Sequence, residues 1–311
     1  MEGPLQSDQG GRKVRSRIVL FVAALVTLPL FAAPKNVPAK SVETAHRKTP
    51  YVGAIAADAQ TGRIIFSDKP DAEAYPASVT KLMTALLVME DVENGKYDYS
   101  TSVTATRDVV RCEASWIGIR AGQSMTVDDL MLAMLVHSAN DAAIVLGVNS
   151  AGSLEAFVDR MNQRAKELGM ENTAYFNPNG LPKPKYAKEF NRSTAADQLK
   201  LALEIVKHET IFKWTSVKLG EARDGNGTLF KMVNHNNVMV KDKWKVINPD
   251  GTEAIDGLKT GFINAGGSSV VLTGKRGGKR AIVVVLGSSS VTERDTNARR
   301  LMEDALSSIS W

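Results

Sequence analysis

Cysteine and histidine are scarce in this chain of 311 residues, which has one cysteine, Cys112, and four histidines. A single cysteine excludes an internal disulfide, and the simplest interpretation of Cys112 is a small buried apolar side chain rather than a catalytic thiol. The histidines are scattered and form no H-E-x-x-H pattern, which argues against a metal-dependent peptidase. We therefore expect neither a metal nor an organic cofactor.

The chain also has little excess of one sign of charge. Lysine and arginine number 39 against 34 aspartates and glutamates, which gives a net charge of only +5. No basic stripe with interleaved aromatic residues occurs, and aromatic residues make up only 6% of the chain. Nucleic acid is therefore not an expected partner.

A long uninterrupted apolar run is also missing. The apolar stretch 18–33 contains Thr27 and Pro29, and it is shorter than the about 20 residues of a membrane-spanning helix. It follows the basic segment 12–17 and precedes small residues, an arrangement typical of a secretory signal. We expect residues 1–39 to be a signal peptide; the alternative is an uncleaved N-terminal anchor, which would provide membrane contact. Either outcome places the rest of the chain outside the cytoplasmic membrane, periplasmic or secreted.

After a linker over 40–50, the apolar patterns predict one domain over 51–311. Short strands are expected at 51–57 and 63–67, a helix at 78–93, and further helices over about 100–208. The C-terminal third changes to strands at 257–263, 269–275 and 280–286 and ends in a helix that begins at Ser290. Strands at both ends with helices between them predict an α/β fold: one antiparallel sheet built from both chain ends, with an inserted helical subdomain. The last helix should present inward Ala298, Leu301, Met302, Ala305, Leu306 and Ile309.

Three short motifs occur in one order along the chain. They are Ser78-Val79-Thr80-Lys81, Ser138-Ala139-Asn140 and Lys259-Thr260-Gly261. Each motif alone is a weak or moderate signal. In this order, however, S-x-x-K, S-x-N and K-T-G are the active-site set of penicillin-recognising serine acyl-transferases.

The first motif supplies a nucleophile and its base. Serine is a poor nucleophile unless a base lies beside it, and Lys81 follows Ser78 by one helical turn, so both side chains share a face. A lysine with an ordinary pKa would be protonated and could not act as a base. We expect burial beside a second cation, Lys259, to lower the pKa of Lys81.

The residues around the motifs resemble one family, the serine D-alanyl-D-alanine carboxypeptidases of peptidase family S11, which are low-molecular-mass penicillin-binding proteins. The resemblance runs from about Tyr51 to the C-terminus and is carried by YPASVTKLMTA (75–85), SANDA (138–142), FNPNGL (176–181) and DGLKTGF (256–262). It implies a DD-peptidase/β-lactamase-like fold and a serine DD-peptidase catalytic domain over 51–311. It further implies peptidoglycan stem peptides ending in D-Ala-D-Ala as substrates, β-lactams as inhibitors, and a place in the bacterial cell envelope.

Roles for the other motif residues follow. We expect Ser138 to relay a proton to the leaving amine and Asn140 to hold a backbone amide of the bound peptide, in addition to any helix-capping role of this segment. The resemblance implies that Lys259 and Thr260 recognise the substrate's terminal carboxylate. Gly261 would remove a side chain where the substrate lies close to the backbone.

Two further expectations concern the oxyanion and the carboxylate. The backbone N–H groups of Ser78 and Phe262 would form the oxyanion hole. Arg294 falls in the first turn of the last helix, where the helix dipole disfavours a cation. The family has an arginine near the start of its last helix that helps to bind the carboxylate, and Arg294 matches it; the alternative is an ordinary exposed surface arginine.

Three alternatives to a carboxypeptidase differ from it in the reaction that they catalyse or lack. An endopeptidase that cuts peptidoglycan cross-links would carry the same motifs. A class A β-lactamase has Ser-Asp-Asn in the second motif and needs a deacylating glutamate, whereas 172–181 contains no carboxylate. A non-catalytic penicillin sensor should have lost a motif residue, and none is lost. Two departures from the family are expected: no C-terminal β domain, and a longer, more basic segment at 216–253 with a hairpin turn at 224–227.

Overall fold

The computed structural model describes residues 50–107, 114–182 and 189–309. The expected leader 1–39, most of the expected linker 40–50, and Cys112 lie outside the described residues. The described residues belong to one compact unit of the chain. Among them, no single helix has the length and apolar composition to cross a membrane; one pair of consecutive helices, 140–151 and 154–167, meets that test jointly but is bent by 85°.

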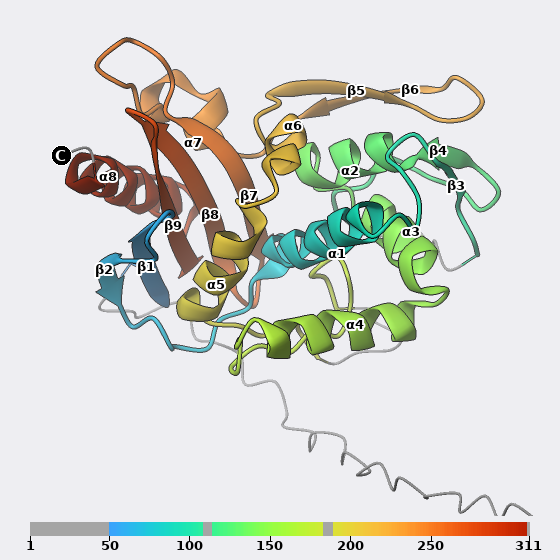
Figure 1. Ribbon diagram of the computed structural model, residues 1–311, viewed down its shortest axis with the longest axis horizontal. Coiled ribbons are helices and arrows are strands. Elements are labelled where there is room, and N and C mark those ends of the chain that lie inside the picture. The colour runs from blue at the N-terminus through green and yellow to red at the C-terminus, as the bar shows by residue number, and fades with distance from the viewer. Residues whose placement is uncertain (1–49, 108–113, 183–188, 310–311) are drawn as a thin grey trace, which may run out of the picture. The chain divides into compact units, whose positions relative to one another are not determined.

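A five-stranded sheet is the base of this unit, with strand order β2-β1-β9-β8-β7 and antiparallel pairing throughout. The register of the central pair, with Ala54 opposite Val285, joins the first strand to the last. The expected sheet built from both chain ends is therefore confirmed (Figure 1). Its strands are β1 (Gly53–Asp58), β2 (Ile64–Asp68), β7 (Ile255–Ile263), β8 (Gly267–Arg276) and β9 (Lys279–Ser288).

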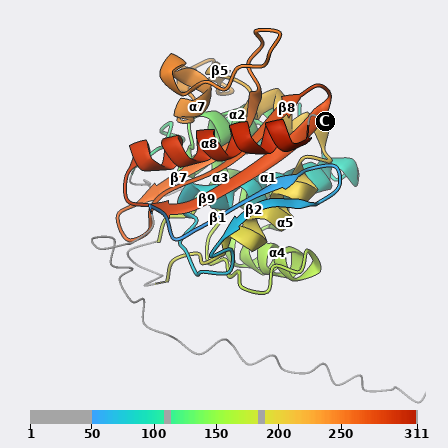
Figure 2. The ribbon, with the colours of Figure 1, turned by 90° about the vertical axis from the view of Figure 1, so that its left-hand side faces the viewer.

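Both faces of this sheet are covered, and the sequence of β9 explains how. Successive strand residues point to opposite faces. Ile282 and Val284 join the core beneath the helical part, whereas Val283 and Val285 pack toward α8 (Val291–Ile309). Figure 2 shows α8 lying across the sheet. All six residues expected to face inward from this helix are buried, which confirms the predicted apolar stripe.

Helices between β2 and β7 form the second half of the unit, as expected. Thr126 and Thr194 are N-caps of two of these helices, because each side chain accepts a hydrogen bond from the backbone N–H three residues on. Asp224 forms the predicted hairpin turn by accepting from the backbone N–H groups of Asn226 and Thr228. The helices are α1 (Lys81–Glu93), α2 (Val127–Val136), α3 (Asn140–Ala151), α4 (Leu154–Glu167), α5 (Ala195–Ile205), α6 (Phe212–Thr215) and α7 (Asn237–Val240).

Short elements complete the unit, most of them too brief to leave a periodic pattern. The 3₁₀ turns are η1 (Ala77–Thr80), η2 (Glu209–Ile211) and η3 (Asp242–Trp244), and the small sheets pair β3 (Ser102–Thr104) with β4 (Ser124–Thr126) and β5 (Leu219–Arg223) with β6 (Leu229–Val233). The expectation of a helix beginning at Ser78 is wrong in detail. Ala77 has φ 51°, a strained conformation for a non-glycine residue, and the chain passes through η1 before α1 begins at Lys81.

Candidate active site

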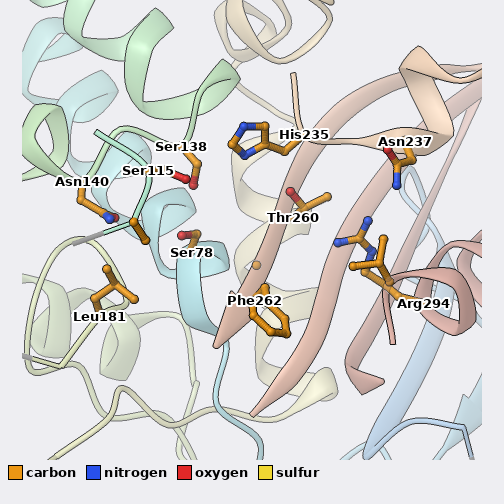
Figure 3. A pocket seen from close by; sticks show the side chains of 13 residues that line it. Ser78, Ser115, Ser138, Asn140, Leu181, His235, Asn237, Thr260, Phe262 and Arg294 are labelled. Carbon is orange, nitrogen blue, oxygen red and sulfur yellow. The ribbon is translucent and has the colours of Figure 1, made fainter. Parts of the chain in front are cut away.

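The three motifs converge on one pocket of about 300 Å³ between the sheet and the helical part. Figure 3 shows Ser78 next to Ser138, with Asn140 on one side and Thr260 and Arg294 on the other. Of the nine predicted site residues, seven line this pocket: Ser78, Ser138, Asn140, Thr260, Gly261, Phe262 and Arg294. The other two, Lys81 and Lys259, are buried.

Lys81 links the first motif to the second. Its Nζ lies 3.0 Å from Ser78 Oγ and 2.7 Å from Asn140 Oδ1. A third bond of 2.7 Å goes to the backbone oxygen of Asn179. The two carbonyl oxygens can only accept from Nζ, whereas the hydroxyl of Ser78 can either accept or donate. The side chain is therefore held in one direction, with its nitrogen in contact with the serine oxygen.

A tight connection between α2 and α3 carries the second motif. Ser138 has φ 64°, a left-handed conformation that turns the chain sharply between the two helices. Asp141, fully buried beside this turn, accepts hydrogen bonds from the backbone N–H groups of Gly118 and Ile119. The backbone N–H of Asn140 donates to the oxygen of Ser115, another pocket residue. Asp141 and Asn140 thus fix one wall of the pocket to the second motif.

Lys259 lies on β7, buried behind the pocket, and its Nζ donates to the backbone oxygen of Thr260 at 3.0 Å. Burial, and after it the positive charge of Arg294, lower the pKa of Lys259 from 10.5 to about 7. A lowered lysine pKa therefore exists in the site, but on the third motif. The lowered pKa expected for Lys81 stays a prediction.

Gly261 is required by the protein's own backbone, and the close approach of a substrate expected from the sequence stays a prediction. A Cβ at this position would lie 2.5 Å from the carbonyl oxygen of Pro76 and 3.1 Å from the nitrogen of Ser78. Gly261 also lines the pocket, but the first atoms that a side chain would meet belong to Pro76 and to η1 directly after it. The glycine allows β7 to lie directly against the turn that carries Ser78. Phe262 follows, with its side chain 57% exposed at the pocket.

Arg294 is buried, so the alternative of an exposed surface arginine is wrong. Only 3% of the residue is accessible, although its side chain carries a full charge. It lines the pocket from the first turn of α8. Its Nε donates to Oδ1 of the next residue, Asp295, at 2.8 Å.

Sequence reasoning missed the part played by the loop 177–180, although FNPNGL was noted as a resemblance. Its contact with Lys81 is through a backbone oxygen, that of Asn179, which no side-chain motif can reveal. Gly180 has φ 88°, and a Cβ there would lie 1.9 Å from the oxygen of Ala77. The loop is fixed to α1 through Thr84, whose hydroxyl donates to the oxygen of Pro178 at 2.7 Å.

Two pocket residues, one between β6 and α7 and one at the start of α7, were also missed. His235 and Asn237 line the pocket (Figure 3), and the run Asn234-His235-Asn236-Asn237 matches none of the three motifs. Desolvation, then the positive charges of Lys259 and other nearby cationic groups, lower the pKa of His235 to about 4. His235 is therefore neutral at neutral pH.

The described residues that line the pocket include no aspartate or glutamate. Elsewhere, Glu90, Glu204 and His208 could in principle approach a metal ion together. Arg164 already occupies that cluster, since it donates to Glu90 at 2.8 Å and to Glu204 at 3.1 Å. The cluster is explained by this arginine and lies apart from the pocket residues.

Comparison with known proteins gives a consistent result. The family model described as D-alanyl-D-alanine carboxypeptidase, peptidase S11, matches residues 41–290. D-alanyl-D-alanine carboxypeptidase DacF of Bacillus subtilis is 31% identical over 283 residues, which cover 91% of this chain and 68% of DacF. A D-alanyl-D-alanine endopeptidase of Escherichia coli is 28% identical over 289 residues, covering 92% of this chain and 87% of that protein.

Solved structures share the fold. The D-alanyl-D-alanine carboxypeptidase DacD of Francisella tularensis has a TM-score of 0.72 at 26% identity, covering 88% of this chain and 74% of DacD. Penicillin-Binding Protein D2 of Listeria monocytogenes in its ampicillin-bound form has a TM-score of 0.70 at 29% identity. That match covers 84% of this chain and 99% of the Listeria chain. The expected DD-peptidase-like fold is confirmed.

Proposed function

Since the chain belongs to the peptidase S11 family of D-alanyl-D-alanine carboxypeptidases, we propose that it removes the terminal D-alanine of peptidoglycan stem peptides through an acyl-enzyme on Ser78. The observation that carries this proposal is the contact of 3.0 Å between Lys81 Nζ and Ser78 Oγ. It pairs a pocket-lining serine with a buried amine, the combination that an activated nucleophile requires.

In the acylation step, Ser78 Oγ attacks the carbonyl carbon of the penultimate D-alanine, and its proton passes to the Nζ of a neutral Lys81. Complete burial supports this role, because it disfavours the charged ammonium. The new Oγ–C bond gives a tetrahedral oxyanion, which the N–H groups of Ser78 and Phe262 stabilise. The close packing of Gly261 against the nitrogen of Ser78 supports this pairing, because it brings β7 to the nucleophile turn.

Collapse of the intermediate breaks the C–N bond. Ser138 relays a proton to the leaving nitrogen of D-alanine, so the amine departs neutral. Asn140 holds the peptide by an amide, while Lys259, Thr260 and Arg294 bind the terminal carboxylate. The absence of acidic side chains among the described pocket residues and the buried charge of Arg294 support a carboxylate at that end. Water then hydrolyses the ester and restores Ser78.

A β-lactam would acylate the same serine and remain bound. The stretch 172–181 has no carboxylate to activate a deacylating water, and the nearest glutamate along the chain, Glu171, is exposed. Asn179 presents only its backbone oxygen to Lys81. We therefore expect a labelled penicillin to stay on Ser78 for minutes. Immediate turnover would instead identify a β-lactamase.

The direct test is incubation with a diacetylated tripeptide that ends in D-Ala-D-Ala. Wild type should release D-alanine and Ser78→Ala should not. No release by the wild type would contradict the carboxypeptidase activity, and equal release by the variant would contradict the role of Ser78. In a matched variant, Lys81→Arg keeps the charge but cannot accept a proton at neutral pH. Acylation retained in that variant would contradict Lys81 as the base.

An endopeptidase is the second candidate, because named D-alanyl-D-alanine endopeptidases are 28–29% identical over most of the chain. A cross-linked peptide dimer offered beside the tripeptide separates the two reactions. Preferential cleavage of the dimer would favour the endopeptidase.

We further propose that the enzyme works outside the cytoplasmic membrane, behind a leader at 1–39 and a linker at 40–50 that precede the catalytic domain 51–311. A basic segment followed by an apolar stretch and small residues supports the leader. N-terminal sequencing of the protein expressed in a bacterium would distinguish a cleaved signal peptide from a retained anchor, and cell fractionation would test the location.

A further inference from the structure

One carboxylate joins two pocket residues that come from different elements. Arg294 lies in the first turn of α8, and Asn237 is the first residue of α7. Asp295 receives a hydrogen bond from each: Arg294 Nε donates to Oδ1 at 2.8 Å, and Asn237 Nδ2 donates to Oδ2 at 2.8 Å. Figure 3 shows Arg294 and Asn237 on the same side of the pocket. Each oxygen of Asp295 thus holds one of them.

The contact between Arg294 and Asp295 is unusual for a helix. Adjacent helical residues do not face each other, so these side chains meet only because both bend to one side. Asp295 is 1% accessible and lies one residue beyond the first turn of α8. A buried carboxylate also compensates a buried guanidinium, whose desolvation is costly when it is unpaired.

Arg294 keeps donor capacity for a ligand. Its Nη2 is buried and has no hydrogen-bond partner among the described residues. It lies 2.6 Å from Oδ1 of Asp295 in an ion pair, but it does not meet the geometry of a hydrogen bond to that oxygen. Buried donors are normally satisfied. An unsatisfied guanidinium donor on a residue that lines the pocket indicates that an acceptor belongs there.

We infer that Asp295 is a positioning residue for carboxylate recognition: it holds Arg294 and Asn237 in the orientation that receives the terminal carboxylate of the ligand. The inference rests on the proposed function, which places that carboxylate beside Arg294. Asp295 does not line the pocket, and it acts through the two residues that do.

The test compares ligands with and without the carboxylate. Asp295→Asn keeps the side chain's shape but removes its charge and one acceptor oxygen. Acylation of the purified protein is measured with benzylpenicillin and with its methyl ester. A hydrogen bond to a charged group is worth about 1.5–3 kcal/mol. Benzylpenicillin should therefore acylate the variant at least about tenfold more slowly than it acylates wild type. The ester should react at nearly the wild-type rate, whereas a general structural defect would slow both ligands equally and overturn the inference.

The matched control is Asp304→Asn. Asp304 lies on the same helix, and its side chain is 62% accessible in a 3.5 Å ion pair with Arg300. This variant should leave the ratio of acid to ester unchanged.

Coupling to Arg294 provides the second measurement. In an Arg294→Lys background, Asp295→Asn should add little further loss on the acid, because its effect passes through the arginine. If each substitution reduced the acylation rate by its own full factor in the double variant, the inference would be overturned.

If Asp295→Asn fails to fold, Asn237→Ala takes its place, since Asn237 is only half-buried. The described residues form no hydrogen bond between Asn237 and Arg294, but both bond to Asp295. If the double variant Asn237→Ala and Arg294→Lys loses less acylation rate than the two single variants predict together, positioning through Asp295 is supported. If the two losses are additive in free energy, the inference is overturned. Penicillin acylation needs no D-alanine release, so failure of the carboxypeptidase assay remains a separate result.

Discussion

Replacing Gly180 by alanine tests whether the loop 177–180 positions the catalytic serine. An alanine Cβ would lie 1.9 Å from the oxygen of Ala77 and 2.9 Å from the nitrogen of Ser78. Restoring an ordinary contact of 3.4 Å requires the loop and the nucleophile turn to separate by about 1.5 Å. Both partners are backbone, so no side chain can rotate away to relieve the clash.

The expected effect has two parts. Gly180 has φ 88°, and a left-handed conformation costs a non-glycine residue roughly 1–2 kcal/mol. The displacement adds to this, because it disturbs the 2.7 Å bond from Lys81 Nζ to the oxygen of Asn179. A misplacement of about 1 Å can cost on the order of 100-fold in rate. We expect acylation by a fluorescent penicillin to slow by about that factor.

Gly152 provides the matched control. It ends α3 with φ 83°, and a Cβ there would meet no atom within 4 Å. Gly152→Ala therefore carries the conformational strain without the clash. It should lower the free energy of unfolding by roughly 1–2 kcal/mol and leave acylation unchanged.

The assay measures both quantities in both variants, by urea denaturation and by stopped-flow acylation. Gly180→Ala should lose more stability than Gly152→Ala and should alone lose acylation. Equal losses of stability with acylation intact in both would refute the reasoning, because they would mean that the loop does not hold the nucleophile turn in place.

Three further predictions follow from other contacts. Because the pKa of Lys259 is about 7, its positive charge is lost as the pH rises through 7, so wild-type kcat/KM on the tripeptide should fall there. Lys259→Arg stays charged and should abolish this alkaline limb between pH 6 and 9, and a limb that persists would exclude Lys259 as its source. Asn191→Ala removes bonds of 3.0 Å to Thr80 Oγ1 and to the oxygen of Asn177; it should lower the free energy of unfolding by about 2 kcal/mol and slow acylation, and unchanged acylation would contradict a link from this asparagine to the site. Asp141→Asn weakens the bonds to Gly118 and Ile119 and should cost about 2 kcal/mol in urea denaturation, whereas a stability equal to wild type would show that these bonds are replaced.

Much of the fold could be predicted because its signals are local. The apolar run of β9 and the apolar stripe of α8 each depend on residues within a few positions of one another. Most of the small elements were missed because they have only three or four residues, too few to show a period. The start of α1 was misplaced because the positive φ of Ala77 has no counterpart in residue type.

The sequence by itself determined which groups do the chemistry here: a serine with a lysine one turn on, a second serine with an asparagine, and a lysine on a late strand. Their order indicates a penicillin-recognising serine acyl-transferase, and the residues around them carry the resemblance to the S11 family. Only the tertiary structure decided how they are held. The oxygen of Asn179 reaches Lys81 across 98 residues, and Asn191 reaches Thr80 across 111. Such contacts involve backbone atoms that every residue possesses, or side chains that are neighbours only after folding, and no local pattern records either.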